Sequence, residues 1–315
     1  MKHWGIDIEL FLGLCIGTGM LFPLLAFAVW PSVTRALLGD MRVPRIVHYI
    51  ALAGLGAALW LRIDGHQASL LIAEFWLRMG LLVICLSYAA IFAIVTNNLA
   101  DLQADRISNP HRPLVSGIVD ARVYLRAGIV CECVALGLAY AADARMGAGI
   151  LAISVGYFIY SCRPLRLKRI PIVSKLLIGI NSLCVAVCGY ALSGGFWLDF
   201  PNIWAFFILV PLSLSANFVD LKDTAGDQAQ GVATLPVLLG EANARHLIAA
   251  ATFATYLMGA ILLDLSWAYP LNVVMAGLHV YFLYRKPYDE RWVFLILIGA
   301  LGGLDLFLFW SKAVF

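Results

Sequence analysis

The sequence contains little charge for its length. Only 13% of its 315 residues are Asp, Glu, Lys or Arg, whereas soluble domains carry about 25%. Hydrophobic residues make up 62% of the chain, so too few polar side chains are present to cover a surface that faces water. The composition therefore excludes a soluble enzyme and a disordered tail protein. The net charge of +3 is too small to indicate a nucleic acid partner.

Two common metal-binding patterns are also missing. The seven cysteines form no Cys-x-x-Cys pair and lie almost entirely in apolar runs, so they indicate neither a zinc site nor a disulfide framework. The motif His-Glu-x-x-His is absent as well. We therefore expect the cysteines to be small core residues.

Long apolar runs are abundant. A helix that crosses a bilayer needs about 20 apolar residues, and ten runs near this length use up most of the chain. Strand-type alternation is lacking. The sequence thus predicts an all-α fold, a polytopic membrane helix bundle. The ten expected spans are 8–30, 46–62, 77–96, 122–143, 146–161, 172–194, 202–219, 245–264, 268–284 and 292–312.

The basic residues predict an orientation for this bundle. When the segments between spans are assigned alternately to two sides, 17 of the 22 Lys and Arg residues fall on one side. Cytoplasmic loops carry the excess of Lys and Arg. We therefore expect an integral, multi-pass membrane protein whose basic loops face the cytoplasm and whose two termini face the opposite side.

Acidic residues avoid most of the spans but cluster at the cytoplasmic ends of two of them. In each cluster the side chains recur every three or four residues, which places them on one face of a helix. The two acidic groups are Asn97, Asp101 and Asp105 after the third span, and Asp220, Asp223 and Asp227 after the seventh.

Carboxylates at this spacing repel one another, and more strongly near a low-dielectric boundary. Two such groups on one membrane side therefore favour a bound cation. Oxygen ligands without His or Cys favour a hard ion, and Mg²⁺ typically bridges carboxylates to substrate phosphates. The alternative interpretation is that both groups are ordinary solvated helix ends.

A basic stretch lies on the same expected side. Residues 160–169 contain four cations within seven residues, and Arg112 lies in a second polar loop. Guanidinium and ammonium groups could bind the oxygens of a diphosphate. The positive-inside rule alone would also explain their presence.

Three patterns follow one another along the chain. The first is Asn97, Asp101 and Asp105, followed by Asn109, Arg112-Pro113 and Ser116-Gly117. The second is Tyr160-Ser161, Pro164 and Lys168. The third is Asp220, Asp223, Gly226-Asp227, Gly231 and Thr234-Leu235-Pro236. Together they resemble the signatures of the UbiA superfamily of intramembrane prenyltransferases, over roughly residues 43–312.

The resemblance implies a nine-span UbiA-like core at 43–315, preceded by an extra N-terminal transmembrane helix and loop at 1–42. It implies a Mg²⁺-dependent prenyltransferase that moves a polyprenyl group from a prenyl diphosphate to a lipophilic, in particular aromatic, acceptor within the lipid bilayer. One departure is Asn98, where the family usually has Asp, so that one anionic ligand is lost.

Residue roles follow from the matched motifs. Asp101 and Asp223 are expected to be essential for catalysis. The expected metal ligands are Asn97, Asp101, Asp105, Asp220, Asp223 and Asp227. The expected diphosphate-binding residues are Arg112, Tyr160, Lys168, Arg169 and Lys222. His48, Glu132 and Asn181 are candidates for the acceptor site or the cavity wall.

Two other functions remain open at this point. A terpene cyclase of the UbiA type would ionise the same prenyl diphosphate without an acceptor, and the Asn98 departure keeps this possibility open. A transporter or a non-catalytic scaffold would also have many spans. We see no clear inverted repeat, however, and the ionisable residues collect at one membrane face rather than at the midplane. The sequence does not reveal an oligomeric state.

Overall fold

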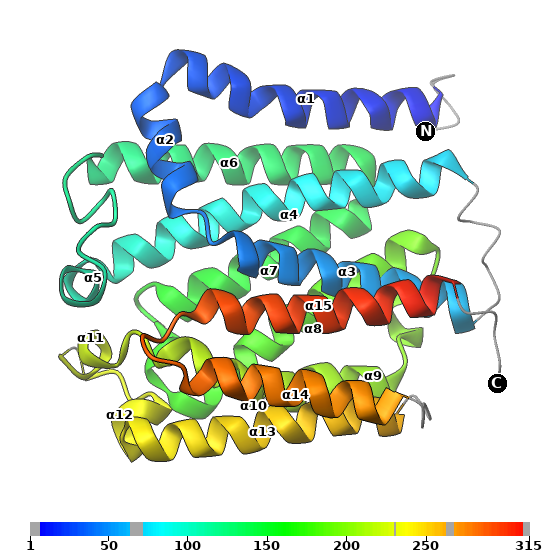
Figure 1. The fold of residues 1–315 in the computed structure, drawn as a ribbon. Helices are drawn as coiled ribbons and strands as arrows, with labels where there is room; N and C mark the ends of the chain where they lie inside the picture. Colours follow the sequence, from blue (N-terminus) through cyan, green and yellow to red (C-terminus); the bar gives the residue numbers. More distant parts are fainter. Residues whose placement is uncertain (1–6, 64–71, 230, 263–267, 311–315) are drawn as a thin grey trace.

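The computed structural model describes residues 7–63, 72–229, 231–262 and 268–310. Within these ranges the chain is all-α and contains no strand. Figure 1 shows long helices packed side by side, with the short helices α5 and α11 at one end of the bundle. The α-helices are α1 (Ile8–Val29), α2 (Pro31–Asp40), α3 (Val43–Ile63), α4 (Ala73–Ala100), α5 (Leu102–Ser108), α6 (Ala121–Ala142), α7 (Ala144–Ser161), α8 (Pro171–Ser193), α9 (Asn202–Phe207), α10 (Ser213–Ser215), α11 (Thr224–Ala229), α12 (Leu235–Leu239), α13 (Glu241–Leu262), α14 (Tyr269–Tyr284) and α15 (Glu290–Trp310).

Eight helical segments in the described ranges are long and apolar enough to cross a membrane, and they coincide with eight of the expected spans. The other two expected spans, 245–264 and 268–284, fall on α13 and α14, and positions 263 and 264 lie outside the described residues. The all-α membrane bundle is therefore confirmed. The count of ten spans stays a prediction.

The N-terminal helix packs along the outside of the bundle, against α4 and α6 (Figure 1). The Tyr88 hydroxyl of α4 donates a hydrogen bond to the carbonyl of Gly19, at 2.5 Å, and the Phe22 ring lies edge-on against the same tyrosine. α2 ends at Asp40, which accepts a hydrogen bond from Tyr124 of α6. The division into 1–42 and 43–315 stays a prediction, although these contacts tie α1 and α2 to the remaining helices.

The first acidic group lies where α4 passes into α5. The backbone N–H of Asp101 donates to the carbonyl of Asn97, and that of Asp105 donates to the carbonyl of Asp101, both at 2.9 Å. These bonds span four residues, as in an α-helix. The predicted helical spacing of this group is therefore present across the junction.

The second acidic group is reached through an irregular helix. Instead of one continuous α-helix, residues 202–220 form α9, a π-helical turn η5 (Ile208–Leu212), α10 and a 3₁₀-helix η6 (Ala216–Asp220). Pro211 lies inside η5 and has no N–H to donate, so a regular ladder cannot continue through it. The backbone of Asp227 nevertheless donates to the carbonyl of Asp223 at 2.9 Å, which preserves the helical spacing there.

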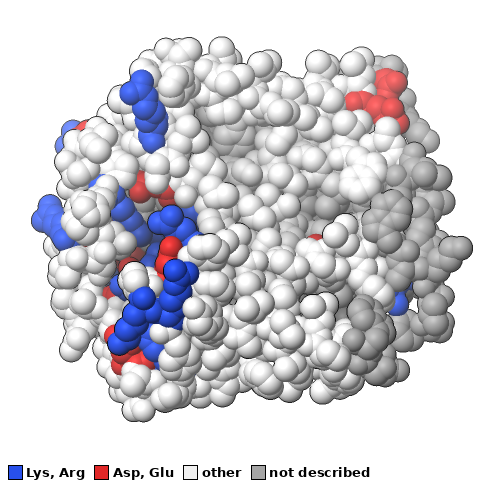
Figure 2. Space-filling model, viewed as in Figure 1, with Lys and Arg blue, Asp and Glu red and all other residues white. Residues whose placement is uncertain are grey.

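Charged side chains are concentrated at one end of the bundle. Figure 2 shows Lys, Arg, Asp and Glu gathered at the end that carries α5 and α11, next to a broad uncharged band. α1 begins and α15 ends at the opposite end (Figure 1). This arrangement agrees with the predicted alternation of the loops, whereas the side that faces the cytoplasm stays a prediction.

Candidate active site

Both acidic groups open into one cavity at the charged end of the bundle, which we call the polar cavity. Its volume is about 90 Å³. All six expected metal ligands line it, together with three of the expected diphosphate-binding residues. The charged and polar residues that line it are Arg42, Arg45, Asn97, Asp101, Asp105, Ser108, Arg112, Tyr160, Lys168, Asp220, Asp223, Asp227 and Thr234.

The first acidic group is held by basic side chains. Asp101 accepts a hydrogen bond from Arg166 at 2.9 Å and also contacts the Lys168 ammonium. Asp105 forms an ion pair with Arg112. Because these carboxylates are buried, the paired cations compensate for part of their lost hydration.

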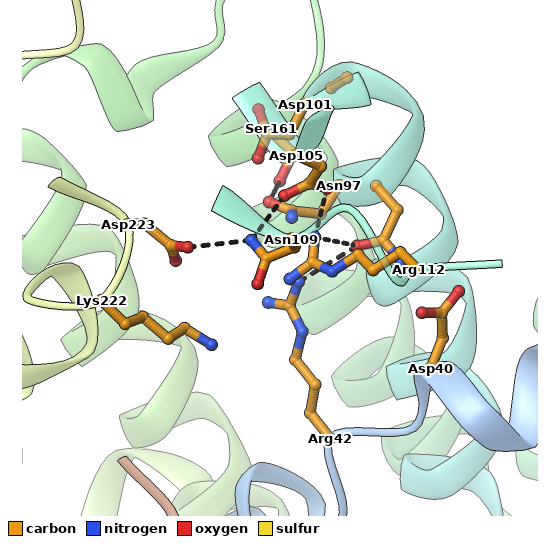
Figure 3. Close-up of polar contacts among 12 residues, drawn as sticks. Asp40, Arg42, Asn97, Asp101, Asp105, Asn109, Arg112, Ser161, Lys222 and Asp223 are labelled. Atoms are coloured by element: carbon orange, nitrogen blue, oxygen red, sulfur yellow. Dashed lines mark hydrogen bonds and ion pairs between the residues drawn. The ribbon is translucent and has the colours of Figure 1, made fainter. Parts of the chain in front are cut away.

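Asn109 connects the two acidic groups. Its amide nitrogen donates to Asp105 at 3.0 Å and to Asp223 at 3.1 Å. Figure 3 shows this side chain between Asp105 on one side and Asp223 on the other. On the second group, Asp220 is paired with Lys175 of α8 at 2.7 Å. The two groups, about 120 residues apart in sequence, therefore share one opening.

Two acids of the second group, Asp223 and Asp227, form no ion pair within the described residues. Burial, and then repulsion from Asp220 and Asp223, raises the pKa of Asp227 to about 7. Burial likewise raises the pKa of Asp105, although Arg112 opposes the shift. The other three aspartates of the cavity, Asp101, Asp105 and Asp220, are each paired with an Arg or Lys side chain. An added cation at this site would therefore be stabilised.

The residues present fit Mg²⁺. The ligand set consists of carboxylate and amide oxygens, which hard cations prefer. Among the described residues, no three acidic, His or Cys side chains converge on one point. Mg²⁺ does not require such a cluster, because it binds proteins through one or two carboxylates and completes its shell with water and substrate phosphates.

Two expected diphosphate-binding residues do not line this cavity. Arg169 is exposed at the end of the 3₁₀-helix η3 (Leu167–Arg169). Lys222 points to Glu290 of α15 at 2.6 Å, and burial lowers its pKa. Arg42 and Arg45, which the sequence indicated only as basic loop residues, lie at the site instead, together with Arg166 of the basic stretch 160–169. No sequence signal separated them from the other loop cations.

An apolar cavity of about 150 Å³ extends from the polar one into the bundle. Arg42, Arg45, Asn97, Tyr160 and Val219 line both cavities. The deeper wall consists of aliphatic and aromatic side chains from α3, α4, α7, α8, η6 and α15, including Ile46, Tyr49, Leu86, Ile153, Tyr157, Ile178, Phe218, Phe294 and Leu297. The two cavities together can hold a molecule with an anionic head and an apolar chain.

Of the three residues proposed for the cavity wall, the structure places only His48 there. Asn181 packs against Gly156 of α7, and its neighbour Ser182 lines the apolar cavity. Glu132 is buried in α6 and lines neither the polar nor the apolar cavity. The interpretation of Asn181 and Glu132 as cavity residues therefore receives no support from their positions.

Asn98 faces away from the polar cavity. It is 1% exposed, and its amide oxygen accepts hydrogen bonds from Arg42 and Arg112, each at 3.1 Å. Its amide nitrogen donates to the Tyr124 hydroxyl at 3.1 Å, and that hydroxyl donates to Asp40 at 2.6 Å. Asn98 thus positions two arginines of the cavity. An aspartate at this position, as the family usually has, would not line the cavity.

We predict that Asn98→Asp leaves the apparent Mg²⁺ affinity unchanged within about twofold while lowering thermal stability. The new carboxylate loses the amide donor, so the Tyr124 hydroxyl has one proton for two acidic neighbours. Titration of activity with Mg²⁺ checks the first part, and thermal unfolding in detergent checks the second. A tenfold gain in Mg²⁺ affinity would show that this position ligates the ion.

Comparisons with known proteins identify the family. Residues 50–298 match the UbiA prenyltransferase family, and this match spans most of the chain. The protein belongs to the UbiA prenyltransferase family.

Its curated relatives include digeranylgeranylglyceryl phosphate synthases. That of Sulfolobus acidocaldarius is 31% identical over 166 residues, which cover 52% of this chain and 57% of the relative. That of Pyrococcus furiosus is 27% identical over 160 residues, covering 50% and 56%. The chain therefore spans little more than half the length of these two relatives.

Solved structures share the fold. A UbiA homologue from Archaeoglobus fulgidus bound to GPP and Mg²⁺ matches with a TM-score of 0.64 at 15% identity, covering 88% of this chain and 98% of the homologue. A UbiA homologue from Aeropyrum pernix K1 without ligand gives 0.64 at 17% identity, covering 85% and 98%. At this identity the likeness concerns the fold alone.

Proposed function

We propose that this protein is a Mg²⁺-dependent intramembrane prenyltransferase. The observation that carries the proposal is the pair of acidic groups at one polar cavity, with an apolar cavity directly behind them. A prenyl diphosphate has the matching shape and charge, with an anionic head and an apolar chain. Family membership and the relatives' names support the same reaction class.

In this reaction the bond between the allylic carbon and the diphosphate breaks, and both electrons leave on the diphosphate oxygen. Bound Mg²⁺, held by Asn97 and the five aspartates, would supply positive charge at those oxygens. Arg42, Arg45, Arg112 and Lys168 line the same cavity and add four cationic groups toward the leaving group.

The apolar cavity protects the cationic carbon. Its aliphatic wall excludes water, which would otherwise capture the carbocation. Along this wall the rings of Tyr49 and Tyr157 pack edge-to-face, with centroids 6.0 Å apart, and the ring centroids of Phe218 and Phe294 are 4.9 Å apart. Aromatic faces attract cations. The acceptor oxygen or carbon then forms the new bond to the prenyl group and releases a proton.

The acceptor proposed first is a glyceryl phosphate lipid. The two digeranylgeranylglyceryl phosphate synthases among the relatives support a glyceryl hydroxyl as the acceptor rather than the aromatic acceptor that the sequence suggested. A cyclase that needs no acceptor is the second candidate, because the aromatic rings of the apolar cavity could also guide a carbocation through ring closure. A transporter is less compatible, since the two acidic groups lie together at one end of the bundle rather than at the midplane.

The polar cavity is proposed to face the cytoplasm. The basic residues predicted for that side gather at the end of the bundle that carries it (Figure 2). Cytoplasmic loops of membrane proteins are enriched in Lys and Arg. Labelling of single cysteines introduced at Arg106 in α5 and at Asp199 between α8 and α9, in a variant whose seven native cysteines are replaced, would test this sidedness.

The activity itself can be tested with purified protein in lipid nanodiscs, geranylgeranyl diphosphate and Mg²⁺. Three reactions run in parallel, with no acceptor, with geranylgeranylglyceryl phosphate and with 4-hydroxybenzoate. We expect pyrophosphate release to rise at least about 100-fold on addition of the glyceryl phosphate acceptor, because the cation is otherwise not captured. Mass spectrometry identifies the prenylated product.

Each other result assigns a different function. Preference for 4-hydroxybenzoate would restore the aromatic acceptor. Pyrophosphate together with a cyclic hydrocarbon in the reaction without acceptor would establish the cyclase. Absence of pyrophosphate in all three reactions, and with farnesyl diphosphate as donor, would reject the prenyltransferase proposal. A reaction with EDTA serves as the metal-free control.

A further inference from the structure

A second apolar cavity lies between α13, α14 and α15, and we call it the α13–α15 cavity. Its volume of about 280 Å³ exceeds that of either cavity at the candidate active site. Gly299 and Gly303 of α15 are exposed and form part of its wall, so it opens on the outer surface of the bundle. Ser215 and Leu297 line both this cavity and the apolar cavity behind the acidic groups.

The lining of this cavity carries no charge. Among the described residues that line it, none is Asp, Glu, Lys or Arg. Transfer of an anionic head into such surroundings would be costly. A prenyl diphosphate is therefore excluded as the occupant, and the ligand has to be neutral.

Two buried polar atoms on its wall lack partners. His279 of α14 and Thr252 of α13 are each 1% exposed and line the cavity. Within the described residues, the Nε2 atom of His279 and the hydroxyl of Thr252 make no hydrogen bond. Buried polar groups are normally paired, because an unpaired one costs about 1–3 kcal/mol.

Other polar side chains on the same wall find hydrogen-bond partners within the protein. The Thr255 hydroxyl donates to the carbonyls of Pro211 and Ala251, and the amide of Asn272 donates to the carbonyl of Tyr256. The other ring nitrogen of His279, Nδ1, is 3.3 Å from the Tyr256 hydroxyl. That contact orients the imidazole and leaves Nε2 as the free hydrogen-bonding atom.

We propose that the α13–α15 cavity binds a neutral lipid that carries a single hydroxyl or carbonyl oxygen. The oxygen bonds to His279 and Thr252, and the chain lies against the glycines of α15. The lipid enters directly from the bilayer. The His279 ring contacts Phe218, with centroids 5.7 Å apart, and Phe218 lines the apolar cavity, so the bound lipid borders the proposed donor chain. The site itself does not depend on the proposed activity.

The test uses a diazirine analogue of geranylgeraniol as the probe and full-length protein in phosphatidylcholine nanodiscs, without any prenyl diphosphate. After illumination, mass spectrometry maps the labelled peptides. We expect labelling in α13, α14 and α15 that saturates with probe concentration. A diazirine analogue of the same chain without the hydroxyl is the matched probe, and we expect it to label about fivefold less, which corresponds to one lost hydrogen bond.

Two variants of neighbouring glycines provide the control. Gly303→Leu fills the cavity, whereas Gly302→Leu adds the same side chain at a position that does not line it, and a Cβ at either position meets no neighbouring atom. We expect Gly303→Leu to lower labelling at least about fivefold and Gly302→Leu to leave it unchanged. His279→Phe should remove the preference for the hydroxyl while hydrocarbon labelling persists.

Equal labelling of the two glycine variants, or equal labelling of the wild-type protein by the two probes, would overturn the proposal. Either result would mean that the probe reaches these helices only from the bulk lipid. Because labelling needs no turnover, the result is independent of the prenyl transfer assay. A protein that binds the probe but transfers no prenyl group would retain this site and lose the proposed function.

Discussion

Asp223→Asn is expected to lower kcat/KM for the prenyl diphosphate by about a thousandfold, a loss typical of removing a group that stabilises developing charge. The substitution removes one of the five carboxylates that line the polar cavity without changing the size of the side chain. The hydrogen bond that Asp223 accepts comes from Asn109, and an Asn side chain keeps an oxygen for it. The loss should therefore appear in catalysis and in the Mg²⁺ requirement while the protein stays folded.

The control is Asp289→Asn, since Asp289 precedes α15 at the same end of the bundle but pairs with Arg291 on the surface, where its side chain is 41% exposed. It should keep activity within about twofold, because exposed ion pairs contribute little. Steady-state kinetics over a range of Mg²⁺ concentrations make the comparison. If Asp223→Asn retained more than a tenth of the wild-type activity, the assignment of the second acidic group as a metal site would be wrong.

The arrangement of the acids could be predicted because local geometry decides it. Asn97, Asp101 and Asp105 repeat every four residues, and the backbone bonds across the α4–α5 junction preserve that repeat. The apolar runs then require both groups to lie at span ends, and alternation of the spans puts those ends on one side. The position of a residue along a helix and its side of the membrane both follow from the sequence. The sequence could therefore predict that the two acidic groups lie close together.

The cations of the site could not be predicted in the same way. Arg166 and Arg169 are three residues apart in one basic loop, yet Arg166 reaches Asp101 and Arg169 is exposed. Arg166 adopts a left-handed backbone conformation, with φ of 41°, that turns the chain before η3. Loop cations also serve orientation in the membrane. The sequence of a basic loop therefore does not indicate which of its Arg and Lys residues contact the acidic groups in the folded protein.

Asn98 shows how a motif position can mislead. In the resemblance it replaces an aspartate next to a metal ligand, which suggested a lost ligand. Its neighbour Asn97 lines the polar cavity, but consecutive residues on a helix point about 100° apart. Asn98 accordingly faces Tyr124 of α6. Which face of α4 meets the cavity depends on how α4 packs on α6, and that packing is a tertiary property.

The second large effect is expected at the crossing of α3 and α8. A Cβ added at Gly56 of α3 would overlap the carbonyl of Ala186, and one added at Gly189 of α8 would overlap the carbonyl of Ala53. The two backbones thus touch, as small residues allow at helix interfaces in membranes. These helices also carry the cavity residues Arg45, His48 and Tyr49 on α3, and Ile178 and Ser182 on α8.

We predict that Gly56→Ala lowers the free energy of unfolding by about 3 kcal/mol, the upper range for overpacking by a small group, because carbonyl and methyl cannot occupy the same space. Separation of the helices should also widen the apolar cavity and weaken prenyl diphosphate binding. Gly137→Ala is the matched control, since Gly137 in α6 has no atom within 4 Å of an added Cβ. Unfolding in mixed detergent micelles compares the two. Equal stability of the variants would show that α3 and α8 do not pack backbone to backbone. The residues of these two helices would then not form the wall of the proposed donor site as described.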